Sequence, residues 1–126
     1  MPLDRKRLGN CYELAGKYQL DRPDRELTLV HGTTQSDPRP PNPHGWIEYE
    51  DDYDWPDRWM VWEPVSNEVM PRSVFYATFN ATEHHRYTRE EVAKLALRHK
   101  HWGPWEGDYW QLGDRKKVVA NGEGTQ

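Results

Sequence analysis

The stretch that decides the fold runs from residue 44 to residue 64 and reads His44-Gly-Trp-Ile-Glu-Tyr-Glu-Asp-Asp-Tyr-Asp-Trp-Pro-Asp-Arg-Trp-Met-Val-Trp-Glu63-Pro64. Residues 46–50 and 58–62 are rich in aromatic and β-branched side chains, which predicts two strands joined by an acidic, proline-containing turn. A turn centred near residues 53 and 54 gives a register in which paired positions sum to about 107. His44 would then lie opposite Glu63, and Trp46 opposite Val61. The hairpin therefore predicts a histidine oriented by a carboxylate, as in general-base catalysis.

Cys11, the only cysteine of the chain, is predicted to begin a helix that ends near Leu20. Asn10 is a suitable N-cap residue for this helix, and Pro23 cannot continue it. Gly16 weakens the helix by about 1 kcal/mol relative to Ala, which indicates close packing at that position. A thiol in the first helical turn lies beside unpaired backbone N–H groups and the positive end of the helix dipole. Both favour the thiolate, and the N–H groups can also stabilise an oxyanion.

Together these features predict a catalytic set for acyl transfer. Cys11 is the expected nucleophile, His44 the general base and acid, and Glu63 the residue that orients the imidazole. Each residue also has a structural interpretation, because a lone cysteine is most often a small buried apolar residue, while His44 and Glu63 could simply flank strands. As an acid at a strand end, Glu63 is expected to be half exposed.

The order of these residues resembles that of the papain-like superfamily, in particular its transglutaminase-like branch. The matching segments are Asn10-Cys-Tyr-Glu-Leu14, His44-Gly-Trp-Ile-Glu48 and Val61-Trp-Glu-Pro64. In that family a helix-starting cysteine is followed by a His-Ala-Trp-Val-Glu-type strand and then by an Asp-Pro-containing strand end. This chain departs from the pattern in having Gly45 instead of Ala, and Glu63 where Asp or Asn is commoner. No clear Gln or Trp precedes the cysteine as a side-chain oxyanion donor.

The resemblance covers about the first half of the chain, and the compact size is similar to that of small proteins from phage and bacterial genomes. It implies an α+β fold in which a small antiparallel sheet packs against the cysteine-bearing helix. It also implies hydrolysis or transfer of an amide, isopeptide or thioester bond in a protein or peptide-like substrate, without a cofactor. Three further residues are expected to contact the substrate: Gln35, Trp46 and Trp62.

Between the first helix and the hairpin, residues 27–31 predict a short buried strand closed by Gly32. Residues 33–43 contain four prolines and predict a loop that cannot be a helix or a central strand. Beyond the hairpin, residues 66–67 predict a turn. Residues 71–80 suit either a short helix that begins at its proline or a strand.

The clearest local signal in the second half is the capping box Thr88-Arg-Glu-Glu91, which opens a helix that runs to about His99. The segment Trp102-Gly-Pro-Trp105 ends this helix. Residues 1–113 are predicted to form a single catalytic-type domain, and residues 114–126 a polar, flexible tail.

Composition limits the function classes. The 126 residues are 35% hydrophobic, and the mean hydropathy is −1.13, so the surface must be polar. A net charge of −4 argues against general binding to nucleic acid or to anionic membranes. A single cysteine excludes an intrachain disulfide, and without a signal peptide or a bilayer-spanning segment we expect a cytoplasmic protein. The histidines at 84, 85, 99 and 101 lack metal-site spacing, so no metal is expected. The oligomeric state stays open.

Two other functions stay open. Residues 48–57 carry six carboxylates and no basic residue, so the hairpin could be the docking face of a non-catalytic binding or inhibitor protein that engages a basic partner. Leu29-Val-His31-Gly-Thr33 resembles the His-Gly-Thr strand motif of ADP-ribosyltransferases, in which the histidine grips the nicotinamide ribose. The helix and the Gly-Leu turn that those enzymes need are replaced here by Asp-Pro-Arg-Pro-Pro-Asn-Pro at residues 37–43. The tryptophans at 102, 105 and 110 are interpreted as core and lid rather than as a sugar platform.

Overall fold

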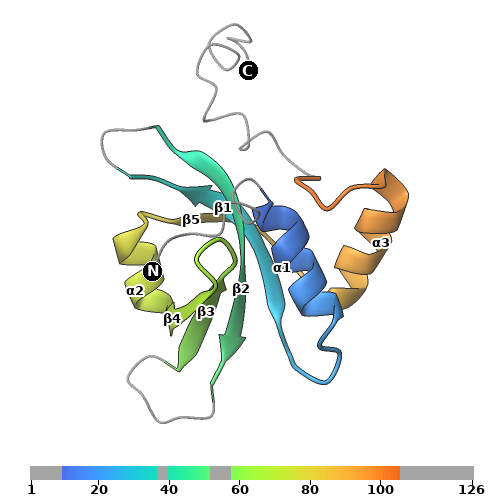
Figure 1. Cartoon of the computed structure of the whole chain (residues 1–126), viewed down its shortest axis with the longest axis horizontal. Helices are drawn as coiled ribbons and strands as arrows, with labels where there is room; N and C mark the ends of the chain where they lie inside the picture. Colours follow the sequence, from blue (N-terminus) through green and yellow to red (C-terminus); the bar gives the residue numbers. More distant parts are fainter. Residues whose placement is uncertain (1–9, 37–39, 52–57, 106–126) are drawn as a thin grey trace, which may run out of the picture.

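The computed structural model describes residues 10–36, 40–51 and 58–105, and shows an α+β fold (Figure 1). The predicted tail at 114–126 and the predicted hairpin turn lie outside the described residues. The elements, in chain order, are α1 (Cys11–Leu20), β1 (Thr28–Thr34), β2 (Asn42–Glu50), β3 (Trp59–Glu63), β4 (Glu68–Pro71), α2 (Arg72–Thr78), β5 (Thr82–Tyr87) and α3 (Arg89–His99). The strands form one antiparallel sheet in the order β4-β3-β2-β1-β5.

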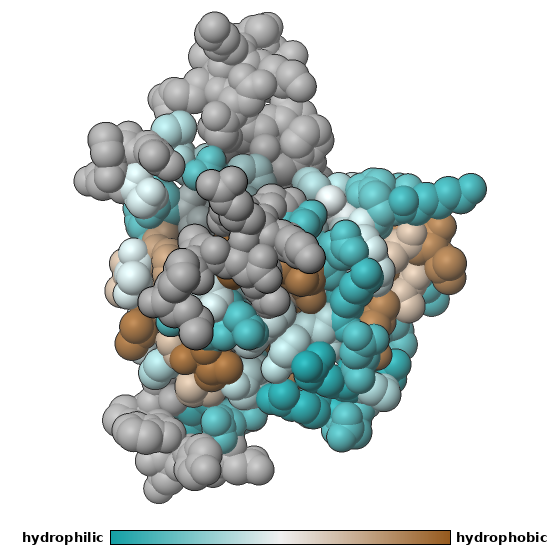
Figure 2. Space-filling model, viewed as in Figure 1, coloured by the Kyte–Doolittle hydropathy of each residue, from teal (hydrophilic) through white to brown (hydrophobic). Residues whose placement is uncertain are grey.

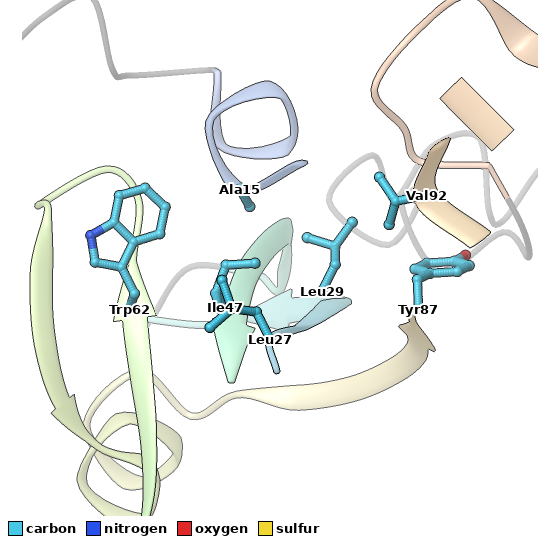
Figure 3. Packing of buried hydrophobic residues seen from close by; sticks show 7 residues of the cluster. All are labelled: Ala15, Leu27, Leu29, Ile47, Trp62, Tyr87 and Val92. Atoms are coloured by element: carbon cyan, nitrogen blue, oxygen red, sulfur yellow. The ribbon is translucent and has the colours of Figure 1, made fainter. Parts of the chain in front are cut away.

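Helices cover both faces of this sheet, with α1 and α3 on one face and α2 on the other (Figure 1). Because side chains alternate along each strand, neighbouring residues of β1, β2 and β3 enter different cores. The core toward α1 and α3 contains Ala15, Leu27, Leu29, Ile47, Trp62, Tyr87 and Val92 (Figure 3). The core toward α2 contains Val30, Trp46, Val61 and Phe75.

The two helices with clear sequence signals form where they are predicted. Helix α3 begins with the capping box, in which the Thr88 side chain accepts from Glu91 N while the Glu91 carboxylate accepts from Thr88 N. Helix α1 has the predicted bounds, although the Asn10 side chain makes no capping hydrogen bond. Close packing at Gly16 is confirmed, because a Cβ there would lie 2.5 Å from the Trp102 ring.

The predicted hairpin register is wrong by two residues. Ile47 pairs with Trp62 and Glu48 with Val61, so paired positions sum to 109, and Trp46 does not lie opposite Val61. The backbone hydrogen bond from Asp51 N to the carbonyl of Arg58 continues the same register, because 51 and 58 also sum to 109. A shift of two residues keeps every side chain on its predicted face, since the side-chain period of a strand is also two.

The strands around the predicted proline loop are longer than expected. Strand β1 extends to Thr34, and β2 begins at Asn42 and includes Pro43, which pairs with Thr33. Pro43 is tolerated because β3 pairs with β2 only from Ile47 to Glu50, so this part of β2 has a strand on one side only.

Residues after the hairpin resolve one ambiguity and add two strands, β4 and β5, that the sequence did not predict. Residues 72–78 form helix α2, while residues 68–71 form the edge strand β4. Strand β5, at the other edge, has only Tyr87 buried. Its sequence Thr-Glu-His-His-Arg-Tyr carries almost no apolar side chains, which explains why it gives no strand signal.

The described surface is polar. In Figure 2, most of the visible described surface is hydrophilic and hydrophobic residues form small separate groups. The exposed large hydrophobic residues are Val69, Val74 and Leu97. Among the described residues, no helix is both long enough and apolar enough to cross a bilayer.

Candidate active site

His44 and Glu63 form the centre of the candidate site. His44 Nε2 lies 2.5 Å from Glu63 Oε2, although the two residues are not opposite each other in the sheet. Continuing the observed register by one step beyond the Ile47–Trp62 pair places Glu63 across from Trp46. His44 is therefore the diagonal neighbour of Glu63 on the same face, a position from which long side chains still meet.

The second oxygen of Glu63 is held by the turn that follows β3. Ser66 N and Ser66 Oγ donate to Glu63 Oε1 at 2.7 and 2.9 Å, which leaves Oε2 for the imidazole. Burial by itself would raise the pKa of Glu63, but the hydrogen bonds from His44 and Ser66 outweigh it and lower the pKa below its usual range. The side chain of Glu63 is 6% exposed, so the expected half exposure is wrong. Both carboxylate oxygens are instead occupied, one by His44 and one by Ser66 in the turn after β3.

Cys11 completes a chain of hydrogen-bonded side chains. It is the first residue of α1, and its side chain is a hydrogen-bond partner of the His44 ring. His44 Nε2 contacts Glu63, so Nδ1 is the ring nitrogen that we assign to the thiol in the mechanism proposed below. Burial by itself would lower the pKa of His44, but the interactions with Cys11 and Glu63 outweigh it and raise the pKa to about 9. The imidazole in this setting therefore favours its charged form at neutral pH.

The backbone at the start of α1 adds a donor beside the thiol. The first hydrogen bond of the helix runs from Leu14 N to Asn10 O, so the N–H of Cys11 has no acceptor within the helix. An unpaired N–H and the positive end of a helix dipole are groups that can stabilise the negative charge that develops on a carbonyl oxygen during attack by sulfur. Cys11 is 7% exposed, so access to the sulfur is narrow.

The residues predicted to contact a substrate are placed differently. Trp46 is fully buried against Phe75, and Trp62 is 6% exposed and stacked on Tyr18 with ring centroids 3.9 Å apart. Their burial does not support the expectation of substrate contact, because both indoles fill the cores of the sheet. Gln35 is partly exposed, and its side-chain carbonyl accepts from Asn80 Nδ2 at 3.1 Å.

The acidic stretch is not solvated throughout, because Glu48 is fully buried. Its carboxylate accepts from Tyr76 Oη at 2.5 Å, from Trp46 Nε1 at 2.9 Å and from Arg86 Nη1 at 2.9 Å, with Arg72 Nη1 at 3.4 Å. Burial by itself would raise the pKa of Glu48, but the hydrogen bonds from Tyr76, Trp46 and Arg86 lower it. Strand alternation was the available signal, since it places Glu48 on the same face as Trp46.

His31, the residue of the ADP-ribosyltransferase alternative, is fully buried. Neither ring nitrogen has a hydrogen-bond partner, and burial together with the nearby His85 lowers the pKa of His31 to about 3. A side chain in this position cannot reach a ribose, so the structure gives no support to that function. Among residues 10–36, 40–51 and 58–105, no group of three or more His, Cys, Asp or Glu residues could hold a metal ion.

Comparison with known proteins gives no assignment. No protein-family model, no curated protein and no solved structure matches this chain. The arrangement of Cys11, His44, Glu63 and Ser66 is therefore the basis from which a function can be inferred.

Proposed function

We propose that this protein is a thiol-dependent acyl-transfer enzyme with a papain-like, transglutaminase-like core. Cys11 is its nucleophile, His44 its general base and acid, and Glu63 the residue that orients the imidazole. The single observation that carries the proposal is the continuous contact from Ser66 through Glu63 and His44 to the thiol at the start of α1. The order of a cysteine on a helix, a histidine on a strand and an acid on the next strand further supports it.

In the first step the thiolate sulfur of Cys11 attacks the carbonyl carbon of an amide, isopeptide or thioester. The N–H of Cys11 donates to the oxygen that gains the electron pair. The imidazolium of His44 gives its proton to the leaving nitrogen or sulfur, the scissile bond breaks, and a thioester on Cys11 remains.

In the second step neutral His44 takes a proton from the incoming water or amine, which attacks the thioester. The thiolate of Cys11 leaves, and the protonated His44 restores the starting pair. Glu63 stays ionised throughout, accepting from His44 Nε2 so that Nδ1 faces the sulfur. We propose a protein or peptide-like substrate, because such a chain carries both amide and isopeptide bonds.

Alkylation of the only cysteine tests this proposal. Iodoacetamide should modify the native protein at pH 6–7 faster than the His44→Ala variant, by about tenfold, because the imidazolium sustains the reactive thiolate. The His44→Ala substitution opens space beside the thiol, so slower alkylation in the variant could not be explained by narrower access to the sulfur. Cys11→Ser provides the blank, and matched thermal unfolding shows that the fold is intact.

Equal alkylation rates in the native protein and His44→Ala would show that the imidazole does not activate the thiol. That result would instead favour a non-catalytic binding protein in which Cys11 is a core residue. The 7% exposure of Cys11 is consistent with this interpretation.

A further inference from the structure

Two residues next to the proposed catalytic pair are in contact with a third, His31. Gly45, which follows His44, is the cross-strand partner of His31 in the β1–β2 ladder. Tyr12, which follows Cys11, places its ring edge-on to His31 with ring centroids 4.7 Å apart and an interplanar angle of 79°. Helix α1 and strand β2 therefore approach each other across the rings of Tyr12 and His31.

This contact is tight at Gly45. A Cβ at Gly45 would lie 3.1 Å from Tyr12 Cδ1 and 3.4 Å from His31 Cδ2. The first distance is shorter than ordinary carbon–carbon contacts, so a methyl group would push the ring away from the strand. The glycine at this position, where the resembled family has alanine, is explained by the Tyr12 ring that occupies the space.

His31 cannot move aside to relieve such pressure. It is fully buried and is bounded by the rings of Tyr87 and Trp105, at centroid distances of 5.1 and 5.2 Å. The segment after α3 closes the remaining side, because a Cβ at Gly103 would lie 2.6 Å from His31 Cε1. Since neither ring nitrogen is hydrogen-bonded, His31 is held by packing alone.

We propose that Tyr12 and His31 are positioning residues that set the separation between the Cys11 sulfur and the His44 ring. Cys11 and Tyr12 are consecutive on α1, and His44 and Gly45 are consecutive on β2, so the thickness of the two rings fixes how closely the start of the helix approaches the strand. This inference depends on the proposed function, because it concerns the distance over which His44 activates the thiol.

The test is Gly45→Ala, followed by iodoacetamide alkylation as a function of pH. Displacement of the thiol from the imidazole by a fraction of an ångström should slow alkylation at about pH 6–7 by about three- to tenfold, since a 1 Å misplacement can cost about 100-fold in an active site. The pH dependence of the alkylation rate in Gly45→Ala should also become more similar to that of His44→Ala. Tyr12→Ala added to Gly45→Ala makes room for the methyl group and should recover part of the loss.

Gly16→Ala is the matched control. This substitution also adds a methyl group to a glycine that packs against an aromatic ring, since a Cβ at Gly16 would lie 2.5 Å from the ring of Trp102. Gly16 is on the same helix as Cys11 but five residues away from it. It should lower the thermal stability and leave the dependence of alkylation on His44 unchanged. If Gly16→Ala slowed alkylation as much as Gly45→Ala, general loosening of α1 would explain both, and the positioning role would be wrong.

A second pair keeps the test decisive should Gly45→Ala fail to fold. Tyr12→Phe retains the ring and should alkylate at the native rate, whereas Tyr12→Ala removes the ring and should be slower. The positioning role would be wrong if Tyr12→Phe and Tyr12→Ala were alkylated at equal rates, or if folded Gly45→Ala were alkylated at the native rate. The proposed function would survive that result as long as the native protein was still alkylated faster than His44→Ala. If the native protein and His44→Ala were alkylated equally fast, the proposed function itself would be wrong.

Discussion

Replacing Glu63 by Gln tests the orientation of the imidazole most directly. Glu63 Oε1 accepts two hydrogen bonds from Ser66, so the amide introduced by the substitution is expected to keep its oxygen toward Ser66 and turn its NH2 toward His44. Nε2 of His44 must then accept instead of donate, which places the ring proton on Nδ1, facing the thiol. In this tautomer His44 cannot take a proton from Cys11 or from an incoming nucleophile.

The size of the effect follows from the pKa of His44. A rise of this pKa from 6.5 to about 9 corresponds to about 3 kcal/mol in favour of the charged ring. This is the net result of the stabilising interactions with Cys11 and Glu63 and of the opposing effect of burial. Loss of the Glu63 charge should therefore lower the pKa of His44 by about one unit or more. Turnover should fall by about 10- to 1000-fold, less than the roughly 10⁴-fold known for the wrong tautomer in a serine enzyme, because the proposed mechanism starts from a stored thiolate–imidazolium pair.

Stability should change in a defined pH range. The pKa of His44 is raised in the folded state, so its contribution is fully present below pH 6.5 and is lost as the pH rises toward 9. In Glu63→Gln the free energy of unfolding should decrease by about 1–3 kcal/mol at pH 6, and its decline between pH 6.5 and 9 should flatten.

Two measurements check these expectations: NMR titration of the His44 ring, and urea unfolding at several pH values. Ser66→Ala is the control, because it keeps the Glu63 charge and removes one of its donors, so it should lower the pKa of His44 much less than Glu63→Gln does. An unchanged His44 titration in Glu63→Gln would refute the reasoning, since it would mean that the 2.5 Å contact does not stabilise the charged ring.

Two further predictions concern buried charge. The pKa of His31 is lowered to about 3, so its contribution to stability is fully present above pH 6.5 and is lost as the pH falls toward 3. In His31→Phe, the free energy of unfolding measured with urea should therefore decrease less between pH 6.5 and 3 than in the native protein. An unchanged decrease would contradict the lowered pKa of His31. Glu48→Gln removes the charge that Arg86 and Arg72 contact, and it should destabilise the fold by about 2–4 kcal/mol in thermal unfolding, whereas the exposed Glu50→Gln should change it by less than about 1 kcal/mol. Equal effects of the two glutamate variants would show that burial does not matter at position 48.

Local chemistry was sufficient to predict several parts of this protein from the sequence. Helix α3 follows from the reciprocal hydrogen bonds of Thr88 and Glu91, and helix α1 from its apolar spacing and the proline after it. The presence of Gly16 in α1 also predicted close packing at that position, although the sequence did not show that the packed residue is Trp102. These features depend on residues within a few positions of one another, so no long-range information is needed.

The proximity of His44 and Glu63 was predicted through a register that is wrong by two residues. It survives because a shift of two keeps both side chains on one face, where diagonal neighbours still meet. Ser66 was missed as the second partner of Glu63, since a turn signal does not specify which side chain its donors will contact.

Only the tertiary structure decided which polar residues are buried. Glu48 belongs to an acidic stretch whose charge predicts a solvated loop, yet donors from β2, α2 and β5 surround it. His31 is enclosed by rings from α1, β5 and the segment after α3. Burial depends on which distant segments pack together, and that is set by the free energy of the whole fold rather than by neighbours along the chain.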